Sequence, residues 1–445
     1  MLNAFEHSQG KTGGLVPQEG RVLMKAAAVV VLIFLFGAGA RPAPLKTEEW
    51  PGWRGPTSQG VSAETGLPVR WGPGENVAWK TQVPGRGWSS PIIYGDRVFV
   101  TSADEDGASC RVVCLDRRTG KINWNTEVYR QHPGNRNPKN SYASPTPVTD
   151  GKNVYAVFGD GGIAALSARG EVVWVNRDHK FYSVHGCGAS PLLHGDLIIF
   201  PYDITSDGED KTVGHLKPWD KSYLLAVEKN TGKVRWKAGR GLSRVAHVTP
   251  QVVAVGGKPQ LVSAAGDVIQ GHDLGTGELL WTVRTQGEGV VPSVVSGGGL
   301  VFTASGFGDP TIYAVRPGGR GDVTRTNVVW TVKKAVPMIP SFLYHDRHLY
   351  TISEGGIALC LKAETGEVLW QERIGGKHSA SPIYADGKIY FLSETGEGTV
   401  IEAGPQFKLV ARNQLDEACQ ASYAISRGRI FIRTEENLYC IGRGN

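Results

Sequence analysis

Cysteine and methionine are scarce in this chain of 445 residues, which has six cysteines and three methionines. No C-x-x-C pair and no Cys/His cluster occurs, which argues against a disulfide scaffold and against a cysteine metal site. Blocks of like charge are missing too: the 48 lysines and arginines exceed the 42 aspartates and glutamates by 6, and the charges are interspersed. Nucleic acid is therefore not expected as a partner. The sequence also lacks a phosphate-binding P-loop, an HExxH motif and a Ser/His/Asp signature.

Glycine, in contrast, is abundant, with 59 residues that follow no three-residue period. This composition predicts frequent turns and argues against a helix-rich or collagen-like chain. The hydrophobic fraction of 40% is sufficient for a packed core.

The N-terminal region has the pattern of an export signal. Residues 26–36 form an apolar run that follows Lys25 and precedes the small residues 38–40, and the run is shorter than the roughly 20 residues of a membrane span. We expect translation to start at Met24, cleavage before Arg41 and a periplasmic or extracellular protein without a membrane span in its mature form. An uncleaved signal anchor is the alternative. The expected organisation is an N-terminal extension and signal peptide (1–40), an extended segment (41–75) and one repeat domain (76–442).

Seven tryptophans recur in similar surroundings at intervals of 40 to 62 residues: Trp79, Trp124, Trp174, Trp236, Trp281, Trp330 and Trp370. Four of the repeats share an 11-residue frame with a central Thr-Gly pair, at 114–124, 226–236, 271–281 and 360–370, and degenerate copies lie at 165–174 and 314–330. Alternating apolar residues around the Thr-Gly pair are typical of a hairpin turn between two strands. A period of this length indicates an array of supersecondary units.

A second marker begins each unit, where a small or polar residue precedes proline or serine, as in WSSP (88–91) and SASP (379–382), and an eighth, weaker copy lies at 421–426. Each unit reads as a four-stranded antiparallel meander, with strands A to D. The last unit lacks a tryptophan-bearing fourth strand, whereas a spare strand around Trp79 precedes the first. We therefore predict an all-β, eight-bladed β-propeller in which the N-terminal strand completes the last blade and removes an open sheet edge.

The repeated frame resembles the A-x-D-x-x-T-G-x-x-x-W tryptophan-docking motif of the quinoprotein-like β-propellers built from pyrroloquinoline quinone (PQQ) repeats. Glu228 and Lys362 depart from its aspartate position. The segment WPGWRGP (50–56) is similar to the N-terminal signature of exported propellers of this kind. The resemblance implies the propeller fold for residues 76–442, and it covers both PQQ-dependent alcohol dehydrogenases and non-catalytic BamB-like scaffolds. The tryptophans are expected to pack between blades, and the cysteines at 114, 360 and 440 to act as small buried packing residues.

In such a meander the A–B and C–D turns lie on one face and the B–C and D–A loops on the other. The three long connections, at 128–141, 177–187 and 202–220, all fall on the second face, which is the expected functional face. Residues that enter strand A should ring the channel mouth there, and we expect them to bind an anionic or polar small ligand or a peptide tail. They are Arg86, Trp88, Tyr142, His185, Arg244, His247, Glu288, Lys377, His378, Glu417 and Gln420. In particular, Trp88, His185, His247 and Lys377 should face one cavity. The alternative is a hydrated channel whose polar groups satisfy one another.

No metal site and no catalytic residue is expected. Residues 203–208 imitate a calcium loop, but Gly214 stands where the bidentate glutamate belongs, and His185, His247 and His378 follow no ligand spacing. PQQ-dependent alcohol dehydrogenases carry two adjacent cysteines beside the cofactor, which this chain lacks. We therefore predict a non-catalytic, monomeric exported propeller that binds a protein or peptide of the cell envelope, or a ligand, through its long-loop face. The alternative is a PQQ-dependent oxidoreductase with calcium, or a sensor of PQQ or another small ligand.

Overall fold

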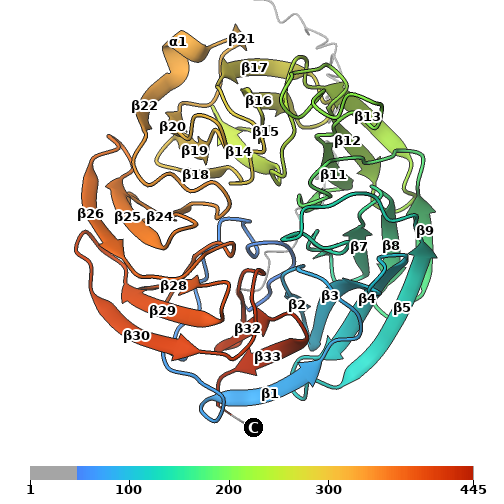
Figure 1. Cartoon of the computed structure of the whole chain (residues 1–445), viewed down its shortest axis with the longest axis vertical. Helices are drawn as coiled ribbons and strands as arrows, with labels where there is room; N and C mark the ends of the chain where they lie inside the picture. Colours follow the sequence, from blue (N-terminus) through green and yellow to red (C-terminus); the bar gives the residue numbers. More distant parts are fainter. Residues whose placement is uncertain (1–47, 444–445) are drawn as a thin grey trace, which may run out of the picture. The chain divides into compact units, whose positions relative to one another are not determined.

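Eight β-sheets surround a common centre in the computed structural model of the chain (Figure 1), which describes residues 48–443. Seven sheets have four strands and one has five, and the strands within each blade are antiparallel apart from one added edge strand. The predicted eight-bladed propeller is thereby confirmed. The expected signal peptide lies outside the described residues. Within residues 48–443, no helix is long and apolar enough to cross a membrane.

The blades follow one another along the chain. Blade one contains β2 (Ile92–Tyr94), β3 (Arg97–Ala103), β4 (Ser109–Asp116) and β5 (Ile122–Arg130). Blade two contains β6 (Val148–Thr149), β7 (Asn153–Val157), β8 (Ile163–Ser167) and β9 (Val172–Asn176). Blade three contains β10 (Leu192–His194), β11 (Leu197–Tyr202), β12 (Tyr223–Glu228) and β13 (Val234–Gly239). Blade four contains β14 (Gln251–Val255), β15 (Lys258–Ala265), β16 (Val268–Asp273), β17 (Leu279–Arg284) and the short edge strand β21 (Gly321–Asp322).

The second half repeats the same order. Blade five contains β18 (Val295–Gly297), β19 (Leu300–Ala304), β20 (Ile312–Val315) and β22 (Val328–Val332), and its only helix is α1 (Thr324–Asn327). Blade six contains β23 (Leu343–His345), β24 (His348–Ile352), β25 (Ile357–Lys362) and β26 (Val368–Arg373). Blade seven contains β27 (Ile383–Ala385), β28 (Lys388–Leu392), β29 (Glu397–Glu402) and β30 (Leu409–Gln414). Blade eight contains β31 (Ala424–Ser426), β32 (Arg429–Arg433), β33 (Asn437–Ile441) and β1 (Val77–Gln82).

Blade eight joins strands from both ends of the chain. Its outer strand is β1, which pairs antiparallel with β33 in a register that sets Trp79 opposite Cys440 and Gln82 opposite Asn437. The backbone groups of β33 on this side are therefore paired with β1. An unpaired edge here would present a row of free N–H and C=O groups to other chains.

The Thr-Gly turn and the tryptophan of adjacent units form one interlocking contact. In blade three the turn glycine, Gly232, has φ +70°, and a Cβ added to it would lie 2.5 Å from the Trp174 ring of blade two. The same ring donates its Nε1–H to the carbonyl of Lys229 at 3.0 Å. Only glycine combines this left-handed backbone with so close an approach. The repeated frame therefore encodes the joint between two blades as well as a hairpin.

Trp281 is the exception among the seven tryptophans. Its Nε1–H bonds to Gln260 of its own blade at 2.9 Å instead of to a turn in the next blade. The corresponding turn of blade five is the expanded one, and its residues 321–322 form β21, which pairs in parallel with β17 beside Trp281. This added strand makes blade four five-stranded and leaves Trp281 fully buried.

The segment that precedes β1 crosses the centre of the ring, drawn in blue in Figure 1. It touches several blades in turn: Trp50 bridges to Ile93 of blade one, Gln251 of blade four donates to the carbonyl of Thr57, and the Ser62 N–H bonds to Tyr384 of blade seven. Its contacts lie at A strands and A–B turns, so we call residues 50–62 the plug. The WPGWRGP motif therefore belongs to the centre of the propeller.

All six cysteines are buried and none is in a disulfide. The thiols at 114 and 360 lie directly opposite Trp124 and Trp370 in the strand pairing, and Cys440 lies opposite Trp79. Burial raises the pKa of Cys114 and Cys360 to about 12 and that of Cys440 to about 11. These side chains act as small apolar groups of the core.

Candidate ligand-binding site

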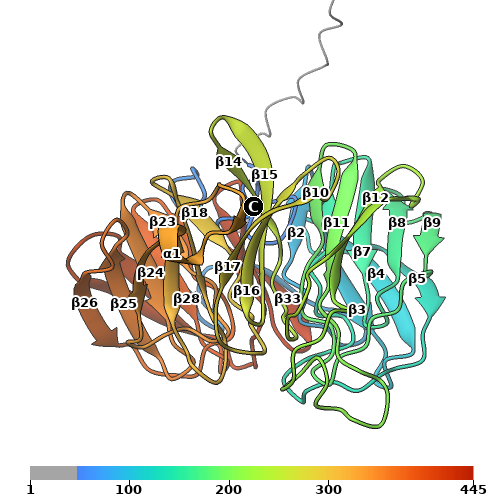
Figure 2. The same cartoon turned by 90° about the horizontal axis from the view of Figure 1, so that it is seen from above.

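A central cavity of about 550 Å³ lies where the strand-A markers of all eight blades converge. Long connections contribute to its wall, with Asn137, Lys139 and Asn140 from the loop between blades one and two and His185 from the loop between blades two and three. Figure 2 gives the side view, with the β14–β15 hairpin at one face and long loops at the opposite face. Trp53 of the plug also lines the cavity. The cavity is thus a cup, bounded by the plug and by loops of the predicted functional face.

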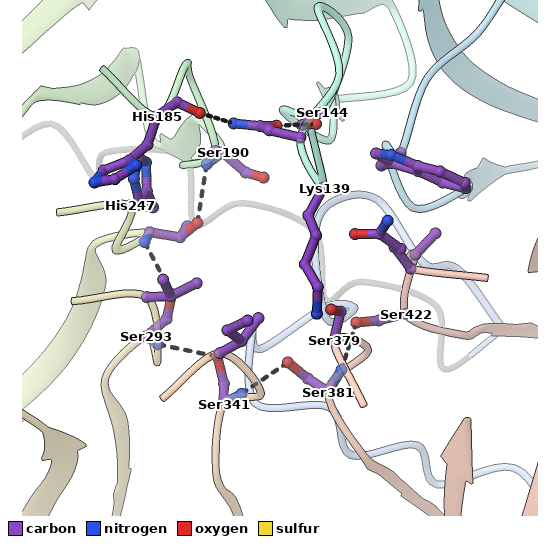
Figure 3. A pocket seen from close by; sticks show the side chains of 18 of the residues that line it. Lys139, Ser144, His185, Ser190, His247, Ser293, Ser341, Ser379, Ser381 and Ser422 are labelled. Atoms are coloured by element: carbon purple, nitrogen blue, oxygen red, sulfur yellow. Dashed lines mark hydrogen bonds between the residues drawn. The ribbon is translucent and has the colours of Figure 1, made fainter. Parts of the chain in front are cut away.

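A closed ring of hydrogen bonds surrounds this cavity. One residue from each strand-A marker accepts, through its hydroxyl oxygen, the backbone N–H of the equivalent residue in the preceding blade, at 2.9 to 3.0 Å. We call these residues the hydroxyl ring, and most of it is visible in Figure 3. Its members, in blade order, are Ser90, Thr146, Ser190, Thr249, Ser293, Ser341, Ser381 and Ser422.

The ring has two chemical consequences. Each member is at most 6% exposed, so the backbone N–H that it binds is shielded from bulk water. Since every hydroxyl oxygen is used as an acceptor, its own hydrogen stays available for a further bond. No acceptor for these eight hydrogens is found among residues 48–443. The ring therefore offers hydrogen-bond donors to whatever fills the cavity.

Lys139 extends across the cavity toward Ser379 (Figure 3). Its ammonium group lies 2.7 Å from the Glu394 carboxylate, which also accepts a hydrogen bond from Ser379 at 2.6 Å. These bonds lower the pKa of Glu394, although burial acts in the opposite direction. The lysine is thus neutralised locally, and its loop, between blades one and two, is tied to blade seven across the opening.

Two tryptophans contribute aromatic surface to the wall. Trp88 comes from the marker of blade one, and Trp53 comes from the plug, where the guanidinium of Arg54 lies 5.6 Å from its ring centroid. Both indoles are half-buried. Aromatic faces beside convergent polar groups are typical of small-molecule sites.

A histidine cluster occupies the side of the cavity next to blades three and four. The Nε2 atoms of His185 and His215 are 3.3 Å apart, and His215 Nε2 lies 3.4 Å from a carboxylate oxygen of Glu288. His247 is adjacent, with its ring centroid 6.1 Å from that of His185, and its Nδ1 is buried without a hydrogen-bond partner. Burial, together with the neighbouring histidine, lowers the pKa of His185, and the same causes lower that of His247 to about 3. The ring of His247 is therefore neutral at pH 7.

Five of the eleven residues predicted at the channel mouth line the cavity: Trp88, His185, His247, Glu288 and Gln420. The other six do not line the cavity, and the polar groups of all but Lys377 are bonded to neighbours elsewhere. Arg86 pairs with Glu435, Arg244 pairs with Asp267 through two hydrogen bonds, and the Tyr142 hydroxyl donates to Gly134.

The remaining three of these six lie in blades seven and eight. His378 is buried with its two ring nitrogens against the carbonyls of Leu392 and Gly375. Glu417 accepts bonds from Lys80, Asn437, Thr434 and Tyr439, and these partners lower its pKa to about 2 against the opposing effect of burial. Lys377 is exposed and does not line the cavity. Of the four residues expected to face one cavity, Trp88, His185 and His247 therefore do so and Lys377 does not.

Sequence reasoning missed Trp53, Lys139, His215 and the hydroxyl ring. The ring had a visible signal, because every strand-A marker carries serine or threonine at a corresponding position. His215 lies in the insertion 202–220 and Lys139 in the loop 128–141, both of which stood out by length. Which side chain of a long loop turns inward depends on contacts with other blades, and the sequence shows no pattern for this.

The cavity is a poor match for PQQ with calcium. Calcium takes six to eight oxygen ligands, several of them carboxylates, whereas the carboxylates of the wall are Glu288 and Glu354. Glu354 already accepts the backbone N–H groups of Met338 and Ile339. PQQ carries three carboxylates, and Lys139, paired with Glu394, is the one lysine or arginine among the residues that line the cavity. These residues do not fit the cofactor.

The chain is similar to known proteins both in sequence and in fold. The profile of the family described as outer membrane protein assembly factor BamB matches residues 66–176, 107–318 and 319–405. Tetrathionate hydrolase from Acidithiobacillus ferrooxidans is 22% identical over 373 residues, which cover 75% of this chain and 66% of that protein. The chain thus spans just under two thirds of the length of this curated relative.

Solved structures agree in fold. BamB from Moraxella catarrhalis superimposes with a TM-score of 0.57 at 15% identity, over 82% of this chain and 96% of that one. A europium-containing methanol dehydrogenase superimposes with a TM-score of 0.50 at 12% identity, over 90% of this chain and 99% of that one. Because the family profile spans most of the eight blades, this chain belongs to the family of PQQ-repeat β-propellers described as outer membrane protein assembly factor BamB.

Proposed function

We propose that this protein is a non-catalytic, exported propeller that binds a small polar ligand in its central cavity. The hydroxyl ring carries the proposal, because it presents eight O–H donors for which residues 48–443 supply no acceptor. A ligand rich in acceptor oxygens satisfies such donors. The two tryptophans offer faces for a flat or ring-shaped molecule.

The charges of the wall favour a neutral ligand over a polyanion. Glu288 and Glu354 line the cavity, and the single lysine is neutralised by Glu394. A protein that binds a free polyanion surrounds it with excess positive charge, and this wall has none. Neutral polyhydroxylated molecules such as monosaccharides are the ligand class that the donors and the aromatic faces fit.

Isothermal titration with a panel of monosaccharides and polyols, with tetrathionate included as an anion, tests the proposal. We expect saturable binding of a neutral member, weakened about tenfold in Lys139→Gln, since a hydrogen bond to a charged group contributes about 1.5–3 kcal/mol. Lys377→Gln is the matched control, because this lysine is exposed outside the cavity, and it should bind as the wild type does. Absence of binding across the panel, or equal losses in both variants, would overturn the proposal.

A second candidate function is the docking of an envelope protein on the rim of the functional face. Three large apolar side chains are exposed there, in loops of blades three to five: Leu216 (54%), Leu242 (62%) and Phe307 (36%). The family to which the chain belongs is described as an assembly factor, which supports a protein partner. Replacing all three by serine should abolish co-purification of an envelope partner, while replacing Val172, Val173 and Val234, exposed on outer strands, should not.

Two enzymatic alternatives are checked with the same purified protein. Turnover of an alcohol with PQQ and calcium in a dye-linked assay would establish a quinoprotein dehydrogenase despite the poor fit of the wall. Loss of tetrathionate would establish the activity for which the Acidithiobacillus ferrooxidans relative is named. We expect neither reaction.

A further inference from the structure

We propose that His185, His215 and Glu288 form a binding site for a divalent transition-metal ion, zinc by its donor set, with an open coordination position toward the central cavity. One ligand atom from each of the three side chains lies within 4.8 Å of the other two. The site does not depend on the ligand proposed above, because it requires only the metal.

The distances between the donors match a tetrahedral metal better than a hydrogen-bonded cluster. Zinc–nitrogen bonds of ~2.0–2.1 Å at tetrahedral angles place neighbouring ligand atoms ~3.3 Å apart. The observed separations are 3.3 Å from His185 Nε2 to His215 Nε2 and 3.4 Å from His215 Nε2 to Glu288. Both exceed the usual N–H···O length of ~2.9–3.0 Å. The third pair, His185 and Glu288, lies within 4.8 Å.

Proton counting favours the same conclusion. His215 Nε2 faces two acceptors, the Nε2 of His185 and the Glu288 carboxylate, and a single N–H serves both poorly. If His185 donates instead, the lone pair of His215 points at a carboxylate. A cation at the common centre lets all three lone pairs converge without a proton between them. Within residues 48–443, His215 is the sole hydrogen-bond or ion-pair partner of that carboxylate.

The backbone around the donors is held by other contacts. The His185 carbonyl accepts bonds from the Asn137 N–H and from the Asn140 side chain at 3.1 and 2.9 Å. Glu288 forms a β-bridge with Phe307, and the His215 N–H bonds to Thr212. Three separate segments, 177–187, 202–220 and 285–294, thus deliver one donor each. The long insertion in blade three thus supplies the donor of His215.

The site opens into the cavity, because His185 and Glu288 line it and His247 stands beside them with a buried, unpartnered Nδ1. Three protein donors leave the fourth tetrahedral position for water or for an oxygen of a cavity ligand, as in zinc sites that act on substrates. Two imidazoles and one carboxylate select zinc or a neighbouring transition metal over calcium or magnesium.

Metal titration of the purified full-length chain, stripped with a chelator and desalted, tests the site. We expect one equivalent of Zn²⁺ to bind in competition with a chromophoric chelator, and Co²⁺ to give the intense visible absorption of a tetrahedral complex. His185→Gln, His215→Gln and Glu288→Gln should each abolish the Co²⁺ spectrum. His132→Gln, which changes an exposed histidine outside the cluster, should retain it.

The urea unfolding midpoint separates loss of the site from loss of the fold. A variant that unfolds like the wild type but no longer gives the spectrum supports the site. A wild type that binds no Co²⁺, or gives only the weak spectrum of an octahedral complex, overturns it, and so does an unchanged spectrum in all three variants. Because no saccharide or polyol enters this experiment, its failure leaves the proposed ligand function unaffected.

Discussion

Replacing Ser341 by alanine tests whether the hydroxyl ring stabilises the propeller. The change removes the oxygen that accepts the Ser293 N–H at 2.9 Å. Both residues are 2% exposed, so the freed N–H cannot turn to bulk water. A buried donor left without a partner costs about 1–3 kcal/mol, and the volume lost is small. We expect the free energy of unfolding to fall by that amount in urea denaturation followed by tryptophan fluorescence.

The matched control is Ser341→Thr, because Thr146 and Thr249 already occupy the equivalent position in blades two and four. It keeps the acceptor and should change the free energy of unfolding by less than about 0.5 kcal/mol. If the alanine variant is as stable as the wild type, or if threonine destabilises as much as alanine, the ring contributes nothing and the reasoning fails.

Three further outcomes are expected. Gly232→Ala should lower the free energy of unfolding by about 2–4 kcal/mol in urea denaturation, because of the positive φ and the clash with Trp174. Gly195 also has a positive φ but lies in open space, so Gly195→Ala should lower it by only about 1–2 kcal/mol. Equal losses in the two variants would refute the docking role of the tryptophan. The buried thiols, such as Cys114 with its raised pKa, should stay unreactive toward a thiol reagent at pH 8 until the chain is unfolded, and fast labelling of the native protein would contradict this. Burial lowers the pKa of His272 to about 4, so between pH 6.5 and 4 the unfolded chain binds a proton that the folded chain does not, and stability falls as the pH falls. His272→Leu should flatten that decline by about 1.4 kcal/mol per pH unit, and an unchanged slope would count against the shift.

The fold was accessible from the sequence because its determinants are local and repeated. Gly232 and Trp174 belong to motifs a few residues long, and each new copy adds evidence for the same joint between blades. The site was accessible only where a side chain sits next to such a motif, as Trp88 and His247 do. Lys139 and His215 come from loops whose paths depend on contacts across the ring, and no short pattern records them.

The misplaced residues carry a related lesson about charge. Glu417 was expected at the channel mouth, but it accepts bonds from four neighbours in or beside blade eight. Its partners Lys80 and Asn437 lie on β1 and β33, far apart in the chain. A charged residue is evident in the sequence, but the residue that neutralises it is not, because the two are brought together only by the fold. Residue type alone therefore predicts polar groups near an opening without telling which of them are available to a ligand.

The pairing of β1 with β33 also sets an order of events during synthesis. Residues 77–82 emerge early, yet their partner strand is residues 437–441, and the plug contacts blade seven through Tyr384. The N-terminal segment must therefore wait, without its final contacts, until the rest of the chain has been made. Contacts between residues so far apart in the sequence form late, and they lower the folding rate. A nascent chain that stops before residue 437 leaves β1 without a sheet to join.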